Sequence, residues 1–192
     1  MQLFFMGDSI TLGVNDSEWL GWTGRVCRRL DPTGKDVTAY NLGVRASTTQ
    51  HIKERWQAEI YARVIRGMES IAVFSFGAAD IANGLTPEQS LENARAILHM
   101  AAGERRVLFI CPPPMADKDR DRVSVELAAG FGSLCRELDI PYLDINTSLR
   151  QNGAYLEDIG SGDGVHPGKA GYEIMADLVY EFMNPFVQQF IC

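Results

Sequence analysis

Three residue types that together perform nucleophilic catalysis occur near the two ends of this chain. Ser9 lies in "FFMGDSITLG", where a short apolar run stops at Gly7, and Asp163 and His166 lie three residues apart in "SGDGVHPGKAGY". A serine hydroxyl becomes a strong nucleophile only when a base takes its proton, and imidazole titrates in the right pH range for that role. A carboxylate at the second ring nitrogen would hold the imidazole in one tautomer and orientation.

Each of these residues also has a purely structural interpretation. Asp and Ser in short glycine-containing stretches commonly bond to their own backbone, so Ser9 could cap a helix and Asp163 could form an Asx turn. A histidine before a proline is often a packing residue. The chain has only three histidines, however, and His51 and His99 both fall within predicted helices. His166 is therefore the histidine placed to reach Ser9.

Composition limits the classes of partner. The 192 residues carry a formal net charge of -7 and contain no run rich in Lys and Arg, which disfavours nucleic acid and anionic membranes. No stretch approaches the roughly 20 apolar residues of a membrane span, and the N-terminus does not resemble a secretion signal. We therefore expect a cytoplasmic protein. Its cysteines form no C-x-x-C pair and are expected to be free thiols: Cys27, Cys111, Cys135 and Cys192.

Short apolar segments alternate with segments of helical spacing along the whole chain. Strands are predicted at 2–6, 36–41, 70–76, 106–111 and 141–144, and helices at 22–30, 49–67, 86–100, 121–138 and 168–190. This alternation indicates parallel strands joined by crossovers, with helices on both faces. We predict one domain over residues 1–192, a three-layer α/β/α fold with a flavodoxin-like, five-stranded parallel sheet.

In such a sheet the ligand crevice lies beyond the carboxyl ends of the strands, near the point where the strand order reverses. The segments that follow the predicted strands are rich in glycine and polar residues, among them "GDSITLG", "LGVRASTT", "GAADIANG" and, near the C-terminus, "SGDGVHPGKAGY". These loops are therefore expected to meet at one edge and to form the site.

The same segments, in this order, resemble the sequence blocks of the SGNH (GDSL-type) hydrolases. The resemblance rests on "GDSIT", "NLGVRASTT", "GAADI" and "DGVHPGKAGY", with "WLGWTGRV" similar to the segment after the nucleophile in lysophospholipase-like and arylesterase-like members. It implies a hydrolase in which Ser9 attacks an ester carbonyl, His166 is the general base and Asp163 orients it. The backbone N–H groups of Ser9 and Gly43 would face the oxyanion.

One position departs from the family pattern. The third block of the family normally reads G-x-N-D, and its Asn side chain is the third oxyanion donor, but this chain has Ala79 at that position. Removing such a donor from a protease costs about 10²–10³ in turnover. Asn83, four residues later, could substitute if the loop turns back.

The expected activity is hydrolysis of a small carboxylic ester through an acyl-enzyme, without a metal or cofactor, since no two histidines have metal-ligand spacing. Two alternatives stay open. A flavodoxin-like protein could use Ser9 and Thr11 to bind a phosphate or flavin. A descendant that only binds acyl groups or sugars would explain Ala79. The apolar tail "FVQQFIC" could serve as an interface in a homo-oligomer.

Overall fold

A five-stranded parallel sheet forms the centre of the computed structural model, which describes residues 1–191. The strand order is β2-β1-β3-β4-β5, the flavodoxin-like order expected from the sequence. The strands are β1 (Gln2–Gly7), β2 (Thr38–Gly43), β3 (Ser70–Ser75), β4 (Arg106–Ile110) and β5 (Tyr142–Leu143). Strand β1 is buried along its whole length because it lies between two neighbours and beneath helices on both faces.

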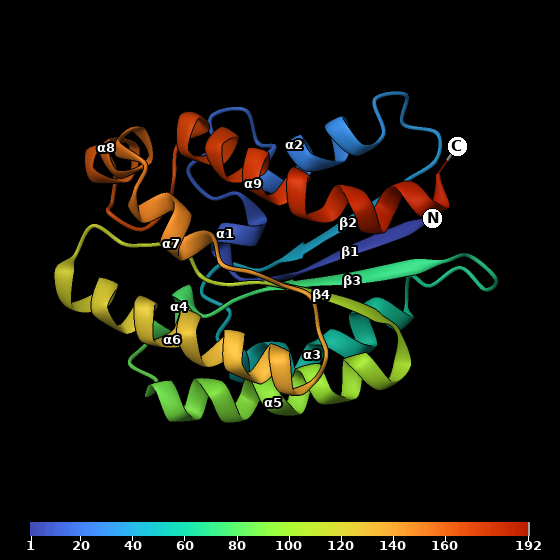
Figure 1. Ribbon diagram of the computed structural model, residues 1–192, viewed down its shortest axis with the longest axis horizontal. Helices are drawn as coiled ribbons and strands as arrows, with labels where there is room; N and C mark the ends of the chain where they lie inside the picture. The colour runs from blue at the N-terminus through green and yellow to red at the C-terminus, as the bar shows by residue number, and fades with distance from the viewer. Residues whose placement is uncertain (192) are drawn as a thin grey trace.

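Helices cover both faces of the sheet, so the predicted three-layer arrangement is confirmed (Figure 1). Helices α2 (Gly21–Leu30) and α9 (Lys169–Val187) pack together on one face, and α3 (Thr49–Tyr61), α5 (Pro87–Glu104) and α6 (Lys118–Glu137) cover the other. Shorter helices follow three of the strands, namely α1 (Ser9–Leu12), α4 (Ala78–Ala82) and α7 (Ile145–Arg150), and α8 (Gly153–Ser161) follows α7. A 3-10 turn, η1 (Gln188–Phe190), follows α9.

Helix α3 ends earlier than its sequence pattern predicts. Apolar residues recur every four positions as far as Val64, but the helix ends at Tyr61, and Val64 is exposed. The buried Gln2 side chain explains the difference, because it donates to Arg63 O and accepts from Ile65 N, both at 2.8 Å. These two bonds hold the segment after α3 as a turn instead of a further helical turn.

The register of the sheet aligns the ends of three strands. Gly7 at the end of β1 pairs with Gly43 on β2 and with Ser75 on β3. The chain leaves β1 toward β2 on one side and later returns to β3 on the other, so the strand order reverses at β1. The loops after β1, β2 and β3 therefore emerge side by side at the switch point, where α/β proteins bind ligands.

Several smaller expectations can be compared with the structure. Cys27, Cys111 and Cys135 are free thiols, and burial raises the pKa of each to about 12, which leaves them unreactive at neutral pH. Cys192 lies outside the described residues. Phe186, in the apolar tail, packs partly against the core, and an interface between copies stays a prediction. Among residues 1–191, no helix has the length and apolar character needed to cross a bilayer.

Candidate active site

Ser9 is the first residue of α1, directly beyond the end of β1. The helix is capped by Asp8, whose Oδ1 accepts a hydrogen bond from Ile10 N at 2.9 Å. The Ser9 hydroxyl is therefore not used as a cap. The close approach of the ends of β1 and β3 depends on Gly7, since a Cβ there would lie 2.0 Å from the Ser75 carbonyl oxygen.

His166 contacts this serine from the far end of the sequence. Its Nε2 lies 2.8 Å from Ser9 Oγ, and its Nδ1 lies 2.6 Å from Asp163 Oδ2. The other oxygen of Asp163 accepts from the backbone N–H groups of Val165, at 2.9 Å, and His166, at 2.8 Å. The three residues that the sequence singled out are thus joined in one chain of contacts, in the order carboxylate, imidazole, hydroxyl.

The electrostatics of Asp163 favour a fixed imidazole. Partial burial of the carboxyl raises its pKa, but the hydrogen bonds from His166 and Val165 outweigh this and hold the pKa at about 2. The carboxylate is therefore charged at neutral pH and keeps a proton on Nδ1 of His166. The opposite nitrogen, Nε2, is then free to accept the proton of Ser9 Oγ.

The expectation that the Gly43 amide faces an oxyanion is wrong. Gly43 N–H donates to the Oδ1 atom of Asn41 at 2.9 Å, so it is already engaged. A glycine is needed here for a different reason: a Cβ would lie 2.3 Å from the backbone nitrogen of Leu12. The close backbone approach that the glycine permits is thus to helix α1.

Ala46, on the loop between β2 and α3, borders the site, and the sequence analysis did not single it out. It lines a cavity of about 330 Å³ together with Ser9 and His166. Its φ of 60° is a left-handed conformation that alanine rarely adopts, and within residues 1–191 its N–H has no acceptor. The N–H of Ser9, in the first turn of α1, likewise has no acceptor there. Two unengaged amide donors therefore border the cavity.

Ala79 lies on α4 and lines the same cavity, with no polar side chain to offer. Asn83 also lines it, but Asn83 Nδ2 donates to the Ala79 carbonyl at 2.7 Å. This bond holds the Asn83 amide within the last turn of α4 and makes it a poor substitute for the missing donor. Asp8 braces this side of the site: its Oδ2 accepts from Ala79 N at 3.3 Å, and burial raises the pKa of Asp8 to about 6.

The comparison with known families identifies the chain. The sequence model of the GDSL-like lipase/acylhydrolase family matches residues 5–174, a range that contains Ser9, Asp163 and His166. The chain belongs to this family. As a GDSL-like hydrolase it is a carboxylic ester hydrolase, which confirms the resemblance drawn from the sequence blocks.

Solved structures share the fold of this GDSL-like hydrolase. A lipase/acylhydrolase from Enterococcus faecalis superposes with a TM-score of 0.80 at 23% identity, covering 96% of each chain. A member of the lipolytic G-D-S-L family from Veillonella parvula DSM 2008 gives 0.79 at 21% identity, covering 94% of this chain and 97% of that one. Axe2, an acetylxylan esterase from Geobacillus stearothermophilus, superposes with a TM-score of 0.77 at 17% identity, covering 95% of this chain and 93% of that one. A search of curated proteins gives no significant match.

Two further observations bear on other ligands of this GDSL-like hydrolase. Thr11, which the phosphate-binding alternative requires, is buried and donates its hydroxyl proton to Ser75 O at 3.0 Å. Its side chain is therefore unavailable to a phosphate. In residues 1–191, no group of three or more His, Cys, Asp or Glu side chains is arranged to hold a metal ion.

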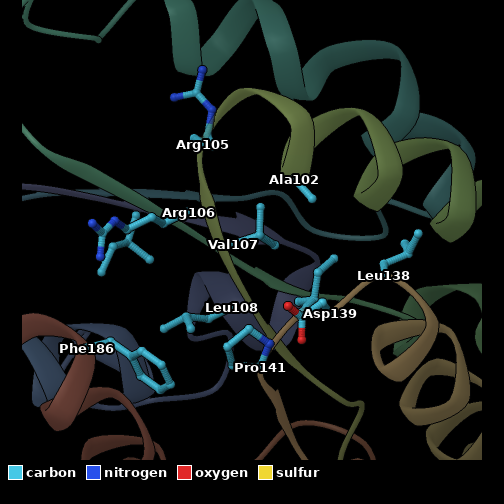
Figure 2. A pocket seen from close by; sticks show the side chains of 11 residues that line it. Ala102, Arg105, Arg106, Val107, Leu108, Leu138, Asp139, Pro141 and Phe186 are labelled. Carbon is cyan, nitrogen blue, oxygen red and sulfur yellow. The ribbon is translucent and has the colours of Figure 1, made fainter.

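A separate cavity of about 400 Å³ lies at the amino-terminal ends of β3 and β4 (Figure 2). Ser9 lies beyond the opposite, carboxyl-terminal ends of the strands. Arg105 points away from it, toward the ring of Tyr61, and the Arg106 guanidinium stacks over Phe190. The lining includes Asp139 but no serine, cysteine or histidine, so this cavity lacks the nucleophile and the base that the site at Ser9 combines.

Proposed function

We propose that the chain hydrolyses small carboxylic esters through a covalent acyl-enzyme, with Ser9 as nucleophile, His166 as general base and Asp163 as the residue that orients it. The observation that carries the proposal is the 2.8 Å contact between Ser9 Oγ and His166 Nε2, with Asp163 bound to the opposite ring nitrogen. This is the geometry that nucleophilic catalysis by serine requires.

The steps follow from the positions of these groups. Ser9 Oγ attacks the ester carbonyl while its proton passes to His166 Nε2, and the negative charge collects on the former carbonyl oxygen. The N–H groups of Ser9 and Ala46 stabilise that oxygen. His166 then returns the proton to the departing alcohol, which leaves an ester of Ser9. In the second half, His166 activates a water molecule that hydrolyses this ester and releases the acid.

The cavity beside Ser9 supports a short acyl group. It encloses about 330 Å³, and its wall on α4 consists of the small side chains of Ala78, Ala79 and Ala82. The oxyanion donors border the same cavity, and the oxyanion belongs to the acyl half of the ester. The acyl group is therefore expected to occupy this alanine-lined cavity. We also propose that residues 1–192 form a single hydrolase domain, supported by the one continuous sheet.

A mass-labelling experiment tests the nucleophile. A p-nitrophenyl phosphonate ester should add one phosphonyl group, on the peptide that contains Ser9, and prior labelling should abolish hydrolysis of p-nitrophenyl acetate. Ser9→Ala should take up no label, whereas Ser161→Ala, which alters an exposed serine bonded to Asp158 O, should label like the parent. Labelling at another residue, or hydrolysis that survives in Ser9→Ala, would refute the acyl-enzyme mechanism.

A further inference from the structure

A groove of about 780 Å³ adjoins the alanine-lined cavity. Arg45 lines both spaces, and Asn15, which lines the groove, donates from Nδ2 to the backbone oxygen of His166 at 3.2 Å. The groove is therefore continuous with the site. With the acyl group beside α4, the groove is the space left for the alcohol half of the ester, and its Asn15 contacts the backbone of the residue whose imidazole must protonate that alcohol.

Trp19, on the loop between α1 and α2, is the most unusual residue of this groove. Its surface is 92% exposed, whereas Trp22 and Trp56 are buried at 0% and 2%. Its φ of 59° is also a left-handed conformation, which is a genuine outlier for so large a residue. Strained residues of this kind persist only where the surrounding structure holds them, and they concentrate at functional sites.

The loop that carries Trp19 is held by a buried ion pair. Asp16 accepts hydrogen bonds from three backbone amides of the loop, those of Glu18, Leu20 and Gly21. Both Asp16 and its partner Arg25 are buried, and Arg25 donates to both carboxylate oxygens. Burial raises the pKa of Asp16, but the bonds from Arg25 and the amides hold it at about 2, so the pair stays charged.

The two ends of the loop are also held together. Gly13 and Gly21 lie back to back, and a Cβ on Gly13 would be 2.7 Å from Gly21 Cα. A loop fixed at these two places holds the backbone of Trp19 in a defined conformation. Fixing it beforehand reduces the entropy that a bound ligand would otherwise have to remove.

Resting on the proposed function, we propose that Trp19 is a specificity-determining residue for the alcohol half of the ester, and that this alcohol is a sugar ring. The groove combines an apolar set of side chains, Leu12, Val14 and Trp19, with a polar set, Asn15, Ser17 and Arg45. A sugar has a C–H face that packs on an indole and hydroxyl groups at its edge that bind polar side chains. An alkyl chain has no groups that could form hydrogen bonds with these polar side chains.

Binding can be measured without turnover in Ser9→Ala. Because Trp22 and Trp56 are buried, quenching of tryptophan fluorescence by acrylamide reports mainly on Trp19. A saturating concentration of a methyl xylopyranoside that carries one O-acetyl group and two free hydroxyl groups should reduce the quenching constant at least twofold, and n-butyl acetate, with the same acyl group and no ring, should leave it unchanged. Absence of protection by the sugar acetate, or equal protection by butyl acetate, would overturn the proposal.

Kinetics of the active protein provide the second measurement. Trp19→Ala should raise KM for the sugar acetate about tenfold, the change that corresponds to about 1.4 kcal/mol, with kcat altered less than about twofold. Trp19→Phe should retain most of the affinity, and KM for butyl acetate should not change. Met100→Ala, which truncates an exposed side chain on α5, is the matched control and should behave like the parent.

The two proposals fail in different ways. Equal KM values for the sugar acetate in Trp19→Ala and the parent, with hydrolysis still dependent on Ser9, overturn the role of Trp19 alone. Hydrolysis that persists in Ser9→Ala overturns the acyl-enzyme mechanism and, with it, this inference.

Discussion

Replacing Ala79 by Asn tests the oxyanion side of the site directly. Family members with the G-x-N-D block have an amide donor at this position, and Ala79 lines the cavity next to Ser9. An Asn here would add a hydrogen-bond donor where negative charge develops in the transition state. Because that donor strengthens as the charge grows, we expect kcat to rise while KM changes little.

The size of the expected gain in kcat depends on whether another side chain already donates to the oxyanion. Removing one oxyanion donor from a protease costs about 10²–10³ in kcat, roughly 2.7–4 kcal/mol. Asn83 Nδ2 is bound to the Ala79 carbonyl, so little of this stabilisation is already supplied by Asn83. We therefore expect a gain of about 100- to 1,000-fold. Ala79 is buried, and crowding could lower the free energy of unfolding by about 1–3 kcal/mol.

The assay compares hydrolysis of p-nitrophenyl acetate by the parent, Ala79→Asn, Ser9→Ala and the double variant, each normalised to folded protein. Asn83→Ala is the matched control, and its kcat should stay within about threefold of the parent if Asn83 donates nothing to the oxyanion. The double variant should be as inactive as Ser9→Ala. A folded Ala79→Asn without any gain would refute the reasoning, because the oxyanion would then lie elsewhere.

Two further substitutions test the residues that support the site. Asp163→Asn should lower kcat by about 10²–10⁴, since its amide would donate to Nδ1 of His166 and leave the proton on the wrong nitrogen; an unchanged kcat would contradict the assigned role. Asp16→Ala leaves Arg25 buried without its main partner and should lower the free energy of unfolding by about 3–5 kcal/mol, measured by urea denaturation. Because the folded pKa of Asp16 is about 2, below its unfolded value, its contribution of about 2 kcal/mol is present above pH 4 and lost as the pH falls toward 2. A parent protein whose stability does not decline over that range, or an Asp16→Ala variant within 1 kcal/mol of it, would refute this account.

The layers of the fold could be predicted because local and global patterns agree. Buried parallel strands appear as short apolar runs, and the helices between them have their own spacing and caps, such as the Thr86 and Gln89 capping box that begins α5. The end of α3 could not be predicted, since it depends on Gln2, a residue 61 positions from Arg63 in the sequence. Contacts of that range have no local signal.

The three residues proposed as catalytic could be singled out for a different reason. Ser9, Asp163 and His166 carry the chemistry in their side chains, and only one histidine lies outside the helices. The proposed oxyanion donors are backbone amides, which every residue except proline possesses. A left-handed backbone is usually signalled by glycine or asparagine, but here alanine adopts it at position 46. For Gly43 the expectation of an oxyanion donor failed, because the sequence shows that a close backbone approach is possible there but not that the neighbour is Leu12 of α1.

Three polar side chains outside the proposed triad, those of Asn41, Arg55 and Asp8, hold the elements of the site in place. Asn41 donates to Thr11 O at 3.0 Å and so ties the loop after β1 to strand β2. Arg55 donates to the carbonyl oxygens of Gly7, at 2.8 Å, and Leu42, at 3.0 Å, which fixes the last residues of β1 and β2 against each other. Asp8 joins the loop after β1 to α4, which follows β3. Together these bonds tie the ends of β1 and β2 and the start of α4 to one another, so an amide donor introduced at position 79 would face an already positioned nucleophile. Catalysis by such a site depends on donors that are oriented before the charge appears. Because these bonds already position the nucleophile and the backbone donors, the missing side-chain amide at position 79 is the feature expected to limit the rate.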